Sequence, residues 1–193
     1  MLICGENTNP LARYSLMAEG EQLHISTYPP IWPTRDTRLG GDYDLSEAIR
    51  IRAAAHSFEA KVFNAVVAGC LTEEMINYVS NGDKNIEEIL RITPRGISMV
   101  VDPTGKKVGG TSSSEEEVSY VNIDLNCCIE PKQFHDVVGS YNRFDIFNLH
   151  VDRSRQEPAT FTEQTKQRSK KTEQMHSGFI PDGEKIQKPR SEI

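Results

Sequence analysis

The sequence predicts an α/β fold, because segments with strand and helix patterns alternate along the chain. Residues 62–67 form a largely apolar run that ends before Gly69, which is typical of a strand buried on both faces. The preceding residues 45–61 instead repeat their apolar side chains at helical intervals. Asp44 can cap that helix, with Glu47 as its capping-box partner. A long helix leading directly into a buried strand favours the α/β class.

The N-terminal segment predicts the end of a strand at residues 1–4, followed by a helix from Pro10 to about residue 19. Asn9 can cap this helix, and Pro10 suits its first turn because the missing N–H is not needed there. Gly20 can terminate the helix. The only cysteine of this segment, Cys4, therefore stands between a strand and a helix.

Further elements follow from local composition. We expect strands at 23–27, 97–101 and 118–125, short helices at 73–79 and 86–92, and a turn at 103–106 before a weak ribbon. Residues 28–33 (Tyr-Pro-Pro-Ile-Trp-Pro) predict a structured loop, because each proline removes an N–H donor and fixes φ. A helical turn and an extended arm are expected between residues 132 and 149.

Charge and hydropathy exclude several classes of function. The net charge is −6, and residues 152–193 carry nine Lys and Arg against seven Asp and Glu, so the body 1–151 stands at −8. An acidic body argues against a nucleic-acid partner. No apolar run has the length of a membrane helix and no export signal is recognisable, so a cytoplasmic protein without a membrane partner is expected. Residues 151–193 are expected to form a polar, disordered tail behind a domain at 1–150.

The cysteines and histidines show no metal-binding pattern. The four cysteines are Cys4, Cys70, Cys127 and Cys128. None has CxxC or histidine-paired spacing, so we expect reduced thiols, no metal and no cofactor, with the last three acting as small apolar residues. His24 and His56 are interpreted as core or interface histidines rather than catalytic bases.

Residues 4–14, Cys-Gly-Glu-Asn-Thr-Asn-Pro-Leu-Ala-Arg-Tyr, resemble the nucleophile segment of nitrilases, which belong to the carbon-nitrogen hydrolase superfamily. The likeness continues in the family's order through residues 21–33, 48–59, 102–105, 121–125 and 136–141. It covers roughly residues 2–149. The resemblance implies the family's α-β-β-α sandwich, with 1–150 as the C-terminal part of the hydrolase domain and its N-terminal strands missing from this chain.

The resemblance implies that Cys4 is a thiol nucleophile, and its place before a helix is one where a thiolate is favoured. On the local sequence alone, an inert buried thiol is the alternative. In the family's mechanism the thiolate attacks a nitrile carbon, and water then releases ammonia and a carboxylic acid through an acyl-enzyme. The family's glutamate base and its lysine precede the cysteine, so they are not assigned here, and the isolated chain is expected to be inactive.

Four other residues are candidates for substrate binding or for positioning the nucleophile. Gly5 stands where many relatives have tryptophan. Glu6 could hold the nucleophile loop by hydrogen bonds, or serve only in capping or in a salt bridge near the helix start. Tyr28 and Trp32, both in the proline-stiffened loop, could wall an apolar pocket or simply pack.

Three functional interpretations stay open. The first is a nitrilase acting on a small-molecule nitrile, a homo-oligomer when full length. The second is an amide-cleaving relative. The third is a non-catalytic, short paralogue that binds full-length nitrilase subunits.

Overall fold

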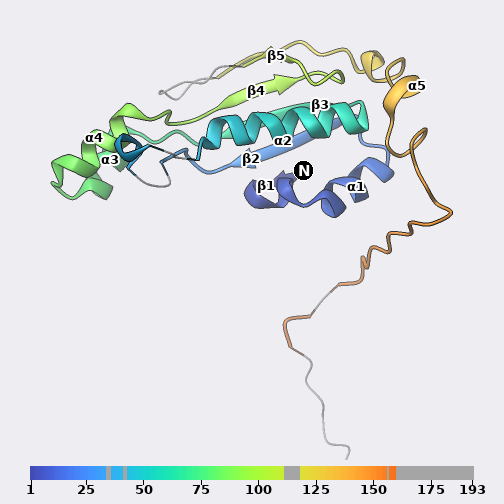
Figure 1. The fold of residues 1–193 in the computed structure, drawn as a ribbon, viewed down its shortest axis with the longest axis horizontal. Coiled ribbons are helices and arrows are strands. Elements are labelled where there is room, and N and C mark those ends of the chain that lie inside the picture. Colours follow the sequence, from blue (N-terminus) through green and yellow to red (C-terminus); the bar gives the residue numbers. More distant parts are fainter. Residues whose placement is uncertain (34–35, 41–42, 111–117, 156, 160–193) are drawn as a thin grey trace, which may run out of the picture. The chain divides into compact units, whose positions relative to one another are not determined.

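The computed structural model describes residues 1–33, 36–40, 43–110, 118–155 and 157–159. The chain divides into two compact units, Met1–Asp152 and Arg153–Ile193. Every helix and strand of the described residues belongs to the first unit (Figure 1). Most of the segment expected to be a disordered tail lies outside the described residues.

The centre of the first unit is a mixed sheet in the order β1-β2-β3-β4-β5 (Figure 1). Its strands are β1 (Leu2–Ile3), β2 (Leu23–Tyr28), β3 (Phe63–Ala68), β4 (Ser98–Val101) and β5 (Lys107–Gly109). The first three run parallel, whereas β4 and β5 are added antiparallel. The strands expected at 23–27, 62–67 and 97–101 and the weak ribbon are confirmed within about a residue, and the strand expected at 1–4 is shorter.

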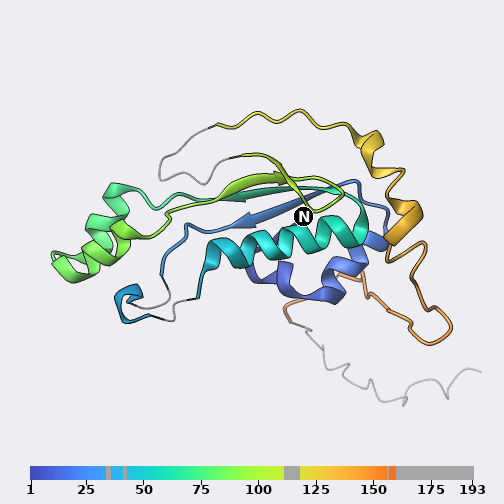
Figure 2. The ribbon, with the colours of Figure 1, turned by 45° about the horizontal axis from the view of Figure 1, so that its top comes forward.

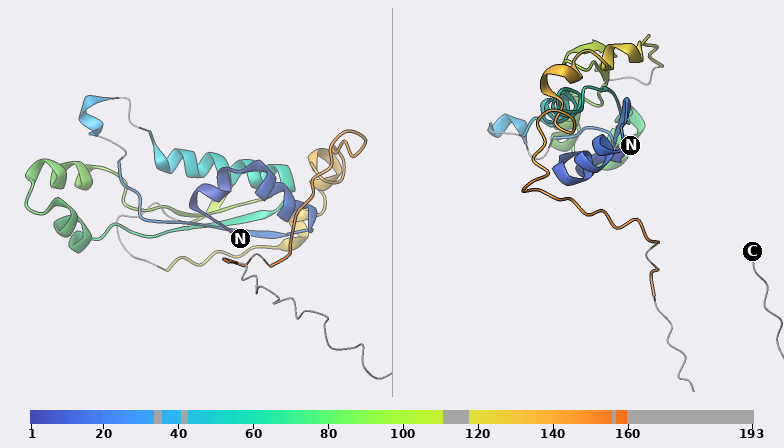
Figure 3. Two further views of the ribbon diagram at one scale, coloured as in Figure 1. Left: turned by 90° about the horizontal axis from the view of Figure 1, so that it is seen from below. Right: turned by 90° about the vertical axis from the view of Figure 1, so that its right-hand side faces the viewer.

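Two helices cover one face of this sheet (Figures 2 and 3). They are α1 (Pro10–Ala18) and α2 (Leu45–Ala60). Ile49 and Ala53 of α2 pack into a core with Val66 of β3 and Met99 of β4. A smaller cluster joins α1 to the end of α2 through Met17, Ala60 and Val62. The helices α3 (Glu73–Ser80) and α4 (Lys84–Ile92) form a pair of their own, and α5 (Lys132–His135) is a single turn. No helix of the described residues is long and apolar enough to cross a membrane.

The helix ends follow the expected capping chemistry with one difference. The Asn9 side chain accepts a hydrogen bond from Leu11 N at 3.0 Å, and Asp44 accepts one from Glu47 N at 3.0 Å. Gly20 follows α1 with a φ of 78°. The expected capping box at Asp44 is wrong in its second half, because the Glu47 carboxylate binds the guanidinium of Arg50 one turn ahead.

The opposite face of the sheet is open among the described residues. On β2, buried His24 and Ser26 alternate with exposed Leu23 and Ile25. Val67 of β3 is 52% exposed, so the expectation that this strand is buried on both faces is wrong for the described part of the chain. The reason is that both covering helices lie on the same side.

The strand expected at 118–125 is wrong. Residues 118–124 are irregular, and they end where Asp124 caps a 3₁₀ helix, Leu125–Cys128, by accepting a hydrogen bond from Asn126 N at 3.0 Å. Val121 does contact the sheet, since a Cβ added to Gly109 of β5 would lie 2.5 Å from one of its methyl groups. Val121 therefore packs beside β5, although the structure assigns no strand to this segment.

Candidate active site

Cys4 directly follows β1 and opens a 3₁₀ helix, Cys4–Thr8. Its thiol is free and the residue is exposed. Its φ is 46°, in the left-handed region. This conformation costs a residue other than glycine about 1–2 kcal/mol, so it persists only where neighbouring groups fix it.

Two side chains of the same turn bracket Cys4. Asn7 is 3% exposed, and its Nδ2 donates hydrogen bonds to Leu2 O at 3.1 Å and to Cys4 O at 3.2 Å. The Glu6 carboxylate accepts a hydrogen bond from Ile3 N at 2.9 Å. Both interactions span the strained residue, so they tie the end of β1 to the first 3₁₀ turn.

The carboxamide oxygen of Asn7 faces β2. It accepts a hydrogen bond from the Ser26 hydroxyl at 2.9 Å and lies 3.3 Å from His24 Nε2. Ser26 and His24 are 1% and 0% exposed. The cysteine turn is therefore anchored on the buried polar side of β2.

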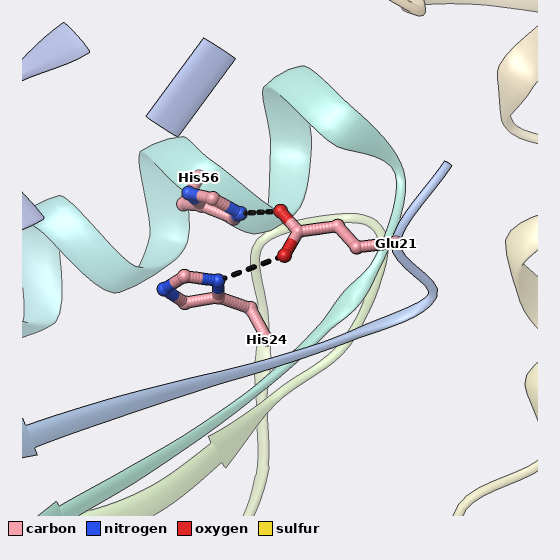
Figure 4. A group of neighbouring side chains, drawn as sticks. All are labelled: Glu21, His24 and His56. Atoms are coloured by element: carbon pink, nitrogen blue, oxygen red, sulfur yellow. Dashed lines mark hydrogen bonds and ion pairs between the residues drawn. The ribbon is translucent and has the colours of Figure 1, made fainter. Parts of the chain in front are cut away.

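Behind His24, a glutamate and a second histidine complete a buried cluster (Figure 4). Glu21, in the connection before β2, places Oε2 2.9 Å from His24 Nδ1 and bonds His56 Nε2 through Oε1. His56 comes from α2, and its ring stacks on that of His24 with centroids 3.9 Å apart. Three segments of the chain thus meet at one carboxylate.

The cluster has a defined charge pattern. Burial alone would raise the pKa of Glu21, but the hydrogen bonds from His24 and His56 outweigh burial and hold its pKa at about 2. Burial lowers the pKa of His56, although the bond to Glu21 opposes the change. At neutral pH, Glu21 is therefore an anion and His56 a neutral ring that donates from Nε2. His56 Nδ1 finds no hydrogen-bond partner in the described residues, which fits the neutral form.

Glu21, His24 and His56 are also the one group of three or more metal-ligating side chains that converge in the described part of the chain. The rings of His24 and His56, however, are inclined to each other by only 28°. Ring nitrogens bind a metal along lone pairs in the ring plane at about 2 Å, and two nearly parallel, stacked rings cannot aim both lone pairs at one such point. The arrangement suits a hydrogen-bonded network better than an ion.

Of the predicted site residues, Cys4, Gly5 and Glu6 lie in one turn. A Cβ added at Gly5 would meet no described atom within 4 Å other than those of its chain neighbours, so the space beside Gly5 is open among the described residues. Tyr28 lies next in register, because Ile3 pairs with Thr27 on the parallel neighbouring strand. Burial raises the pKa of Tyr28, the Arg52 guanidinium opposes this rise, and a negative charge on Cys4 adds to it.

Trp32 lies apart from this turn. It is 47% exposed and lines a cavity of about 300 Å³ together with Tyr43 and Pro94. Tyr28, in contrast, is 8% exposed and belongs to the core. The sheet register thus places Tyr28 beside Cys4, whereas Trp32 lines a cavity formed by other segments.

Sequence reasoning missed Asn7 and Glu21 as parts of the site. Asn7 stands inside the segment that carries the family resemblance, and its burial was not foreseeable from that segment alone. Glu21 stands three residues before His24, but nothing in this spacing indicates that His56 joins the pair.

The fold and this site define a class of protein: an α/β protein that presents a cysteine at the carboxyl end of a parallel strand, where α/β proteins bind their ligands. The family model of carbon-nitrogen hydrolases matches residues 1–133. The chain belongs to the carbon-nitrogen hydrolase family, and its resemblance to the nitrilase superfamily is confirmed.

Known relatives agree with this assignment. A nitrilase of Penicillium rubens is 30% identical over 169 residues, which cover 84% of this chain and 49% of that protein. An arylacetonitrilase of Fusarium vanettenii is 28% identical over 80% of this chain and 46% of its own length. The chain thus spans about half the length of these relatives. They support a hydrolase at the level of the family.

Solved structures confirm the predicted α/β fold of the superfamily. A carbon-nitrogen hydrolase from Helicobacter pylori superposes with a TM-score of 0.55 at 16% identity, over 76% of this chain and 46% of that one. The NitFhit protein of C. elegans superposes with a TM-score of 0.53 at 20% identity, over 82% of this chain and 32% of that one. At these identities the likeness concerns the fold alone.

Proposed function

We propose that Cys4 is the nucleophile of a nitrilase that converts a nitrile to a carboxylic acid and ammonia. The observation that carries this proposal is the turn itself: an exposed thiol on a strained residue, fixed by hydrogen bonds from the buried Asn7 side chain. Strained backbone conformations are common at functional sites, and they persist only where the surrounding structure fixes them. Relatives named nitrilase and arylacetonitrilase support a nitrile as the substrate.

In the proposed reaction the Cys4 sulfur is first the nucleophile and finally the leaving group. The Cys4 sulfur bonds to the nitrile carbon and the nitrogen takes up a proton, which gives a covalent thioimidate. Water then adds to that carbon, and ammonia leaves as the thioester forms. A second water releases the carboxylic acid and returns the thiol. Two waters are consumed for each ammonia and each acid produced.

Other residues of the chain are proposed to support this chemistry. Glu6 holds Ile3 N and so fixes the approach of the chain to Cys4. Gly5 leaves room for the substrate beside the sulfur. Tyr28 closes the inner side of the site, and Trp32 is proposed as an outer wall that a partner segment would bring closer.

The proton-transfer groups are proposed to come from protein outside this chain. No hydrogen bond joins the Cys4 thiol to a glutamate or lysine among the residues that the structure describes. Because the chain spans about half the length of its relatives, we propose that the remaining half of the hydrolase domain supplies a glutamate base and a lysine. A positioned proton-transfer group is worth about 10²–10⁴-fold in rate, so the chain alone retains only a trace of activity.

The test measures ammonia release from arylacetonitriles, aliphatic nitriles and the corresponding amides. The full chain is assayed alone and after co-expression with the N-terminal half of a related nitrilase, each with and without Cys4→Ala. Activity on nitriles that requires the added half and disappears in Cys4→Ala supports the proposal. Turnover of amides only would show that the substrate is an amide and not a nitrile. Turnover that survives Cys4→Ala would refute the role of Cys4. Inactivity of a complemented, correctly assembled protein would favour a non-catalytic subunit.

A further inference from the structure

We propose that Glu21, His24 and Asn7 act together as positioning residues that hold the turn of Cys4 in its left-handed conformation. The inference rests on the proposed role of Cys4 as nucleophile and adds to it the residues that prepare the nucleophile. None of the three touches the reacting atoms. They act through one another and through the backbone.

The first link is the orientation of the Asn7 carboxamide. Its nitrogen faces two carbonyl oxygens, those of Leu2 and Cys4, which accept hydrogen bonds and cannot donate them. The nitrogen must therefore point into the turn and the oxygen toward β2. Any group that fixes the oxygen therefore also fixes the nitrogen that donates to the carbonyl of Cys4.

The second link is His24, which fixes that oxygen. Its Nε2 faces Asn7 Oδ1, an acceptor, and its Nδ1 faces the Glu21 carboxylate, also an acceptor. Because neither partner can donate, each contact is a hydrogen bond when the ring nitrogen that faces it carries a proton. The His24 side chain is 0% exposed, so no solvent replaces either partner.

The third link is Glu21, which contacts the other nitrogen of the His24 ring. The Glu21 side chain is 13% exposed, and its two carboxylate oxygens contact His24 and His56, one each. His56 stands on α2, so the longest helix of the described residues is connected through Glu21, His24 and Asn7 to the carbonyl of Cys4. Charged groups around the cluster include Arg13 of α1, which pairs with Glu59 of α2 at 3.5 Å.

The chain of bonds explains how the strain at Cys4 is maintained. The Glu6 bond to Ile3 N is exposed, so water competes with it. The bonds of Asn7 are buried or partly buried. A buried polar group that loses its partner costs more free energy than an exposed group that loses its partner. The buried side of the turn therefore decides the conformation of Cys4.

Nuclear magnetic resonance on the full chain, without substrate, tests the inference. A positive φ brings the amide proton and Hα of a residue close together, so Cys4 should show a strong intraresidue nuclear Overhauser effect (NOE) between them. Asn7→Asp, which removes the Nδ2 donor, and His24→Leu, which removes both ring donors, should abolish the strong NOE. His24→Gln, which can still donate to Asn7, should restore it. Ser57→Ala is the matched control, because Ser57 is a buried neighbour of His56 whose hydroxyl has no described partner.

Alkylation of Cys128, which is 1% exposed, reports in the same samples whether the fold survives. Loss of the NOE in Asn7→Asp and His24→Leu, with Cys128 protected, supports the inference. A strong NOE retained in both, with Cys128 protected, overturns it. If either variant exposes Cys128, the milder Glu21→Gln decides: a weakened NOE with Cys128 protected supports the inference, and an unchanged NOE overturns it. Because no substrate is used, this result is independent of the turnover assay that tests Cys4 as nucleophile.

Discussion

Leu2 of β1 is paired in register with Ser26 of β2. This parallel pairing sets the end of β1 against the polar, buried side of β2, where Ser26 and His24 reach Asn7. The position of the thiol therefore depends on a sheet register as well as on the turn that carries it. The sheet, the helical face and the polar cluster can each be tested separately.

Glu21 should make stability depend on pH in a defined window. Its pKa is lowered from 4.5 to about 2, so the unfolded chain takes up the proton first. The stabilisation is present above pH 4.5 and is lost as the pH falls from 4.5 toward 2, and it is on the order of 3 kcal/mol before solvent screening reduces it. In urea unfolding, Glu21→Gln should have a lower free energy of unfolding than the unchanged chain at pH 7. This difference should narrow as the pH falls across the window. The exposed Glu74→Gln is the control, and a deficit independent of pH would contradict the assignment.

His56 should add a second window at higher pH. Its pKa is lowered from 6.5 by burial, so the unfolded state again binds the proton first and stability falls as the pH drops below 6.5. Replacing His56 by Gln, which keeps a donor for Glu21, should remove this part of the pH dependence. Unfolding curves from pH 8 to 5 measure it, and an unchanged slope in His56→Gln would count against a neutral, buried ring.

Two adjacent valines test which face of the sheet is covered. Val66 is 1% exposed beneath α2 and Val67 is 52% exposed on the other face. Val66→Ala should destabilise the chain by about 2 kcal/mol or more, since it removes buried methyl groups and leaves a cavity. Val67→Ala should stay within about 0.5 kcal/mol. Equal losses for the two variants in denaturant titrations would contradict the described layering.

Capping of α2 gives a local test of the helical layer. Asp44→Ala should cost about 1 kcal/mol, because the N–H of Glu47 loses its acceptor. Asp44→Asn keeps an acceptor oxygen and should cost much less. Thermal unfolding of the three proteins at pH 7 measures the order, and an Asn variant as unstable as the Ala variant would point to a role other than capping.

The elements that sequence reasoning located are those whose signals are local. Asn9 before Pro10 and Asp44 before an apolar helical repeat define helix starts through bonds within one turn, and both caps are present. The prediction of a strand at 118–125 was wrong, because alternating apolar residues do not specify a pairing partner. In the structure, packing of Val121 on Gly109 replaces that pairing.

The site was predictable only in part. The likeness of residues 4–14 to a nucleophile segment singled out Cys4, and the roles of Cys4, Gly5, Glu6, Tyr28 and Trp32 remain proposals. The cluster of Glu21, His24 and His56 was out of reach, because His56 is 35 positions from Glu21 and joins it only when α2 packs on β2. A tertiary contact of this kind leaves no periodic signal in a single sequence.

The role of Cys4 is measured most directly by mass spectrometry of the complemented protein, quenched with acid during turnover of an arylacetonitrile and digested. We expect a covalent acyl or thioimidate adduct on the peptide that contains Cys4, and none on the peptides with Cys70, Cys127 or Cys128. The adduct should be absent from Cys4→Ala. Turnover accompanied by an adduct on another cysteine, or by an adduct that persists in Cys4→Ala, would contradict Cys4 as the nucleophile.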